Sequence, residues 1–128
     1  MKYYMSTTFN GSFDDAVNKV TEELKKYGFG VLTEIDVKKT FKEKLDVDFK
    51  KYKILGACNP ANAHKALLSE DKIGIMLPCN VIVEEHEDGV VEVSAVDPMA
   101  SMQAVENDEL EPIAIHIRDQ LGKVINDV

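Results

Sequence analysis

Apolar positions along the chain repeat with two different periods, and each period predicts its own kind of element. Alternation at every second position is typical of a strand, whereas spacing of three or four is typical of an amphipathic helix. Aromatic and threonine residues at 2–9 predict a first strand. Apolar residues then follow at helical spacing over 13–27. Ser12 is a suitable N-cap for that helix and Gly28 a suitable glycine at its C-terminal end.

The middle of the chain predicts two more strands and two more helices. Residues 30–37 alternate, which indicates a half-buried strand with Val31, Thr33, Ile35 and Val37 on one face. A short helix from Thr40 through Leu45 and a third strand at 51–58 follow. Asn59 and Pro60 then predict a helix that runs to about residue 68, because Asn is a good N-cap and Pro suits the first helical position.

The C-terminal half predicts a hairpin and a long final helix. The short apolar segment 72–77 is interrupted by Pro78, which in a strand implies an edge, a bulge or a break. Residues 80–85 and 90–96 form the hairpin strands around a tight turn at 86–89. A connector leads to Asp108, the expected N-cap of the last helix, with Glu111 in the capping-box position. The core stripe of that helix is Leu110, Ile113, Ile117, Leu121, Val124 and Val128.

This order of elements predicts a single α+β domain over residues 1–128. We expect a mostly antiparallel sheet with the helices packed on one face. The other face would carry small polar residues such as Thr7 and Thr33. Such a face needs either solvent or a second subunit.

Charge and composition exclude several classes of partner. The net charge of −8 argues against general nucleic-acid binding, because an acidic surface repels phosphate. No apolar run approaches the roughly 20 residues of a membrane span, and the N-terminal residues lack the apolar region of a secretory signal. A cytoplasmic location with reduced thiols is therefore expected. Seven lysines between Lys38 and Lys53 form either a solvated surface or a rim that attracts anions or an acidic partner subunit.

The two cysteines, Cys58 and Cys79, each precede an asparagine, and a proline lies next to each Cys-Asn pair. The runs ILGACNPANAHKAL and IGIMLPCNVIV, the following hairpin with VDP, and FKEKLDVDFKKYKILGACNP closely resemble the bacterial and archaeal "domain of unknown function 302" family. The resemblance covers essentially the whole chain. It implies a fold similar to that of the TATA-binding protein and a homodimer. The residues that it marks, without assigning them an activity, are Cys58, Asn59, Pro60, Pro78, Cys79 and Asn80.

The Cys-Asn pairs are the candidate site, comprising Cys58, Asn59, Cys79 and Asn80. Cys58 precedes a helix N-terminus, which favours a thiolate. A soft divalent metal such as zinc could be held by Cys58 and Cys79, with His64 or a residue from a second subunit completing the site, since zinc prefers Cys and His ligands. Thiol redox chemistry and a small-molecule pocket are the other chemical readings. Buried cysteines that serve only packing are the structural alternative.

The most favoured interpretation is a dimeric cytosolic domain that binds a small ligand or a metal at these pairs. A structural or interaction module without chemistry, or a thiol-dependent redox enzyme, are the alternatives. The carboxylates of 84–88 and His86 are expected to form a solvated hairpin tip.

Overall fold

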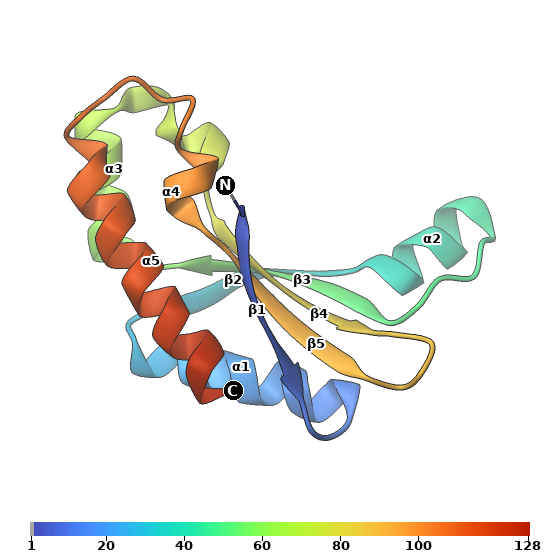
Figure 1. Cartoon of the computed structure of the whole chain (residues 1–128). Helices are drawn as coiled ribbons and strands as arrows, with labels where there is room; N and C mark the ends of the chain where they lie inside the picture. Colours follow the sequence, from blue (N-terminus) through green and yellow to red (C-terminus); the bar gives the residue numbers. More distant parts are fainter. Residues whose placement is uncertain (1) are drawn as a thin grey trace.

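One antiparallel sheet of five strands organises the chain (Figure 1). The structure is a computed structural model, which describes residues 2–128. The strands lie in the order β1-β5-β4-β3-β2, and each pairs antiparallel with its neighbours. Their bounds are β1 Tyr4–Phe9, β2 Gly30–Asp36, β3 Tyr52–Cys58, β4 Cys79–Glu85 and β5 Val91–Val96. The predicted α+β class and antiparallel sheet are confirmed.

Two long helices, α1 (Phe13–Lys26) and α5 (Leu110–Asp127), cover one face of this sheet. The main core lies between them and the strands. Helix residues at three- and four-residue spacing meet alternate residues of the strands, as amphipathic packing requires. Its fully buried side chains include Val20, Leu24, Leu55, Val81, Val83, Val93, Leu121 and Val124.

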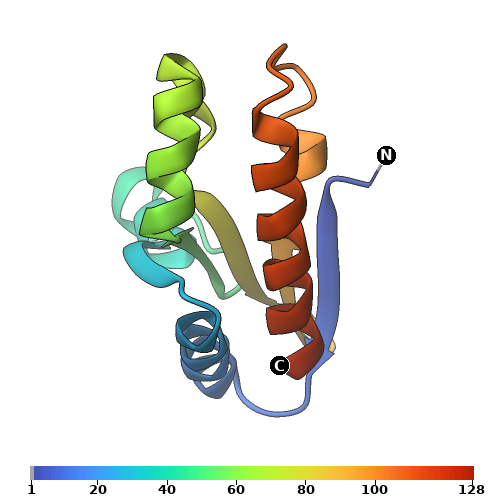
Figure 2. The same cartoon turned by 90° about the vertical axis from the view of Figure 1, so that its left-hand side faces the viewer.

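A second, smaller core lies beyond the sheet, beside the first turns of α5. Helix α3 (Pro60–Ser69) runs alongside α5 there (Figure 2), and the 3₁₀-helix η1 (Asp71–Met76) and the short α4 (Pro98–Ser101) complete the cluster. The prediction that 72–77 belongs to an interrupted strand is wrong. Ile73 is buried in this second core, where it is 1% exposed, so the segment forms a 3₁₀-helix instead of a strand.

Two helix starts that were predicted from a short polar N-cap residue are confirmed. The Ser12 hydroxyl accepts a bond from the Asp15 N–H at 3.1 Å and caps α1. The Asn59 side chain accepts from the Asn62 N–H at 3.2 Å and caps α3. Gly28 follows α1 with φ +84°, a conformation that glycine adopts without strain.

Two other predicted helix starts are wrong. Helix α2 spans Val37–Leu45 and is capped by Asp36, whose carboxylate accepts from the Lys39 N–H at 3.0 Å, so it starts before Thr40. Helix α5 begins at Leu110 after Glu109, which has helical backbone angles and makes no side-chain cap. Asp108 is therefore not its cap.

A bulge in β2 divides residues that simple alternation assigns to one face. The pairing of β2 with β3 shifts between Val31 and Thr33. Val31 packs against the main core, whereas Ile35 pairs with Ile54 on the opposite face and is 48% exposed. A bulge adds one residue to a strand, so every later residue of that strand lies on the opposite face from the one that simple alternation predicts.

Thr7 of β1 also lies on the opposite face of the sheet from the one expected. Thr7 pairs with the buried Val93 on the helix-covered side, because Met5 and Phe9 pack into the core. Ser6 and its partner Ser94 lie instead on the other face.

The segment 37–51, which we call the arm, extends away from the sheet (Figure 1). It contains α2, none of whose residues is buried, and the loop that leads to β3. Phe41 and Phe49 stack edge to face at 5.2 Å and hold the two limbs of the arm together. The arm is thus stabilised by its own side chains at its outer part, whereas Lys50 and Lys51 at its end bond Glu84 and Glu85 of β4.

Candidate functional site

The face of the sheet that the helices leave uncovered is hollowed over β1, β5, β4 and β3. The hollow has a volume of about 450 Å³. Its walls combine three tyrosines and aliphatic side chains with a few polar groups. The lining residues are Tyr3, Tyr4, Tyr52, Asn80, Ile82, Glu84, Glu92, Ser94, Ala95 and Val96.

The strand register gives this surface an apolar part and a polar end. One row across the sheet runs Ser6, Ser94, Ile82, Ile54 and Ile35. The next row includes Glu92, Glu84 and Tyr52, which face one another across β5, β4 and β3. The two glutamates are therefore direct cross-strand neighbours at one end of the hollow.

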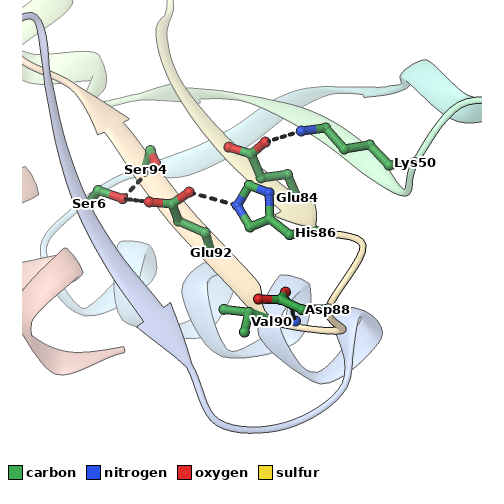
Figure 3. A network of polar contacts seen from close by, with 8 residues as sticks. All are labelled: Ser6, Lys50, Glu84, His86, Asp88, Val90, Glu92 and Ser94. Atoms are coloured by element: carbon green, nitrogen blue, oxygen red, sulfur yellow. Dashed lines mark hydrogen bonds and ion pairs between the residues drawn. The ribbon is translucent and has the colours of Figure 1, made fainter.

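A network of polar contacts holds Glu92 (Figure 3). The Ser6 hydroxyl donates to Glu92 Oε2 at 2.5 Å and lies 3.0 Å from the Ser94 hydroxyl. His86 Nε2 lies 2.9 Å from Glu92 Oε1. The bonds from Ser6 and then His86 hold the pKa of the Glu92 carboxyl below its usual value. Glu92 is thus kept ionised at a site that is only partly open to water.

Glu84 has a separate cation. Lys50, from the end of the arm, reaches Glu84 Oε1 at 2.7 Å. The Glu84 side chain is 13% exposed, and those of His86 and Glu92 are 37% and 31% exposed. These are half-buried groups, so the expectation of a solvated hairpin tip holds for Glu87 and Asp88 but not for Glu84 and His86.

Glu84, His86 and Glu92 bring one nitrogen and two carboxylate oxygens within 4.8 Å of one another. Within residues 2–128 this is the one group of three His, Cys, Asp or Glu side chains that converges so closely. Sequence reasoning missed it. The available signal was the hairpin itself, because a tight turn at 86–89 places residues 84 and 92 opposite each other on the same face.

The two cysteines of the predicted site are both free thiols but differ in environment. Cys79 belongs to the main core beside Val81 and is 6% exposed. Burial, and secondarily the nearby Cys58, raise the pKa of the Cys79 thiol to about 11. Cys58 at the end of β3 is partly exposed. A raised pKa disfavours the thiolate that redox or metal chemistry requires.

The two asparagines and His64 lie in different settings. Asn59 caps α3, and its side-chain nitrogen approaches Gly28 so closely that a Cβ there would lie 3.0 Å away. Asn80 is exposed on β4 and lines the hollow. His64 is exposed on α3, and Cys58, Cys79 and His64 do not form a convergent group within residues 2–128.

Fold and surface together define a small α+β protein whose sheet has one helix-covered face and one open, hollowed face. The chain belongs to the family described as "Domain of unknown function DUF302", whose sequence model matches residues 5–128. The resemblance inferred from the two Cys-Asn pairs and their flanking sequences is thereby confirmed.

A solved structure supports the same assignment. It is the uncharacterized conserved protein DUF302 from Bacillus stearothermophilus, which is 25% identical in sequence. The likeness has a TM-score of 0.92 and covers 99% of this chain and 98% of that one. No curated protein matches the chain. Across residues 2–128, no helix combines the length and apolar character needed to cross a membrane.

Proposed function

We propose that this protein binds a small molecule in the hollow on the open face of the sheet. The observation that carries the proposal is the composition of that surface, which combines Tyr3, Tyr4 and Tyr52 with aliphatic side chains and has a short polar end. Ligand sites are typically concave, mostly apolar and provided with a few polar groups that orient the ligand.

The size and asymmetry of the hollow support a compact ligand with an apolar body. A volume of about 450 Å³ falls in the range of roughly 300–1,000 Å³ that is usual for small-molecule sites. Ile82 and Val96 are among the residues that provide its apolar contact area. The polar head of the ligand would point toward Glu84 and Glu92, where the only ionised groups of the lining residues lie.

The proposal retains one residue of the Cys-Asn pairs as a ligand contact. Asn80 offers an exposed amide to the hollow, whereas Asn59 is engaged as a helix cap. A metal site at Cys58, Cys79 and His64 stays a prediction, which the raised pKa of Cys79 disfavours. Both cysteines being free is in keeping with a reducing, cytosolic setting.

The test uses three probes with the same apolar body and different heads: phenethyl alcohol, phenethylamine and phenylacetate. Each is titrated into ¹⁵N-labelled protein with chelator present, and amide shifts are mapped. We expect shifts at residues of the hollow, strongest for the amine because its positive charge is attracted to the carboxylates of Glu84 and Glu92.

Two arginine variants make the test specific. Ile82→Arg fills the hollow and should abolish the shifts. Ile75→Arg, at a position 79% exposed on η1 and outside the hollow, should leave them intact. Shifts that persist in Ile82→Arg, or that map to another face, would contradict the proposal.

We also propose that the chain works as a homodimer in which the arm packs against the second copy. Three apolar side chains of the arm, Leu45, Val47 and Phe49, are exposed by 65%, 47% and 37%. The arm carries six lysines against three acidic residues, a net charge of +3. The rest of the chain carries −11, the difference from the total of −8, so the arm of one copy is attracted to the body of another.

Sedimentation equilibrium tests this arrangement. The wild type should have twice the chain mass of 14.3 kDa. Leu45→Glu should shift the mass toward the monomer, whereas Leu68→Glu, 75% exposed on α3 and outside the arm, should not. A wild-type mass of a single chain would exclude the dimer.

A further inference from the structure

We propose that Glu84, His86 and Glu92 form a binding site for a divalent transition-metal ion at the polar end of the hollow. The site lies on the β4–β5 hairpin, away from the Cys-Asn pairs (Figure 3). It does not depend on an organic ligand in the hollow, so its success or failure is separate from that of the proposed function.

Convergence of the donors is the first support. The ligand atoms of the three side chains already lie within 4.8 Å of one another. Metal–ligand bonds of about 2.0–2.2 Å to His nitrogen and Glu oxygen place such donors roughly 3–4 Å apart. Small side-chain rotations therefore suffice to close the three groups around an ion.

The charge at this position is the second support. Glu84 and Glu92 are directly opposite each other, and like charges in that relationship destabilise a sheet. Lys50 supplies one positive charge through Glu84 Oε1. With His86 neutral, the three ligands and Lys50 carry a net charge of −1. A divalent cation changes this net charge from −1 to +1. Both glutamates are then attracted to the ion that lies between them.

Outer contacts orient two of the ligands. The Ser6 hydroxyl donates to Glu92 Oε2, which leaves Oε1 directed at His86. Lys50 bonds Oε1 of Glu84, which leaves Oε2 of Glu84 free to bind an ion. Hydrogen bonds of this kind commonly fix metal-ligating carboxylates in place. In the metal-free protein a proton on His86 Nε2 accounts for the 2.9 Å contact with Glu92. For Nε2 to bind a metal, the neutral ring takes its other tautomer, in which the proton is on Nδ1.

The donor set indicates the class of metal. One imidazole nitrogen with two carboxylates suits zinc, cobalt, manganese or iron better than calcium or magnesium, which take oxygen ligands. Three protein ligands leave coordination positions for water or for a ligand head. Glu84 and Glu92 both line the hollow, so these positions open into it.

Calorimetric titration of chelator-treated protein with Zn²⁺ at neutral pH tests the site. We expect one equivalent to bind per chain. His86→Ala and Glu92→Gln should each weaken binding by at least about tenfold, because each removes a direct ligand. His64→Ala and Cys58→Ser are the matched controls and should bind as the wild type does.

Two further readouts guard against a folding artefact and identify the ligands. Zn²⁺ should raise the melting temperature of the wild type and of Cys58→Ser, but not that of His86→Ala. The Co²⁺ complex should lack the near-ultraviolet charge-transfer band of a cobalt–thiolate bond. Absence of Zn²⁺ binding, equal affinity in His86→Ala, or a thiolate band that disappears in Cys58→Ser would overturn the proposal.

Discussion

Glu84 and Glu92 face each other directly across the ladder of β4 and β5, two carboxylates in adjacent strands of an otherwise largely uncharged surface. Such a pair costs stability unless cations or hydrogen-bond donors compensate it. Here Lys50 bonds one member, while Ser6 and His86 bond the other. The arrangement concentrates negative charge at one end of a tyrosine-lined hollow.

The bonds to Glu92 predict a pH dependence of stability. Since the folded protein lowers the pKa of Glu92, the ionised form stabilises the fold. This contribution is complete above the ordinary pKa of a glutamate and is lost as the pH falls through the lower pKa of the folded state. Ser6→Ala removes the largest cause and should raise the pKa of Glu92 toward its usual value. Carboxyl ¹³C titration by NMR measures this, and Ser101→Ala, whose hydroxyl bonds a carbonyl of α4, is the control.

The thiols should differ in reactivity. Because the pKa of Cys79 is raised to about 11 and its side chain is buried, it should react with a disulfide reagent at pH 8 far more slowly than free cysteine. Cys58 should account for the faster phase. In Cys58→Ser the native protein should show no fast thiol, and denaturant should release one. A fast thiol that survives in Cys58→Ser would refute this assignment.

The two asparagines should separate into structural and surface roles. Asn59→Ala removes the cap of α3 and should lower the free energy of unfolding by about 1 kcal/mol. Asn80→Ala, on the exposed side of β4, should change it by less than about 0.5 kcal/mol. Chemical denaturation measures both. Ligand titration should show the reverse order, with only Asn80→Ala weakening binding in the hollow.

Gly56 should tolerate no side chain. A Cβ at this position would clash with the Thr33 hydroxyl and lie 2.9 Å from Pro78 Cγ. Overpacking of this kind costs about 1–3 kcal/mol, so Gly56→Ala should lower stability by that amount. Gly30→Ala, whose Cβ meets no atom within 4 Å, should stay within about 0.5 kcal/mol of the wild type. Thr33→Ala in the Gly56→Ala background should recover part of the loss.

Local signals explain which parts of the fold could be predicted from the sequence. The caps at Ser12 and Asn59 act on N–H groups three residues away, so they can be recognised from a short window. The bulge after Val31 and the coiling of 72–77 depend on contacts with distant elements. No short stretch of sequence around those residues contains the contacts that cause the bulge or the 3₁₀-helix.

The candidate site illustrates the same limit. Alternation along β4 could have assigned Cys79 to the core, because it shares a face with Val81 and Val83. The importance of Glu92 could not be found this way. Its strongest bond comes from Ser6, 86 residues earlier, and becomes apparent only when β1 pairs with β5.

The three proposed metal ligands all lie within the nine consecutive residues 84–92. The turn between them is closed by backbone bonds from His86 to Val90 at 2.8 Å and from Gly89 to His86 at 2.9 Å. Their mutual geometry is therefore encoded by one contiguous peptide, independent of the helical layer. Such a segment is portable: transplanted onto the hairpin of an unrelated antiparallel sheet, it should carry its donors along, and only the serine and lysine that steady them would need to be supplied by the new host.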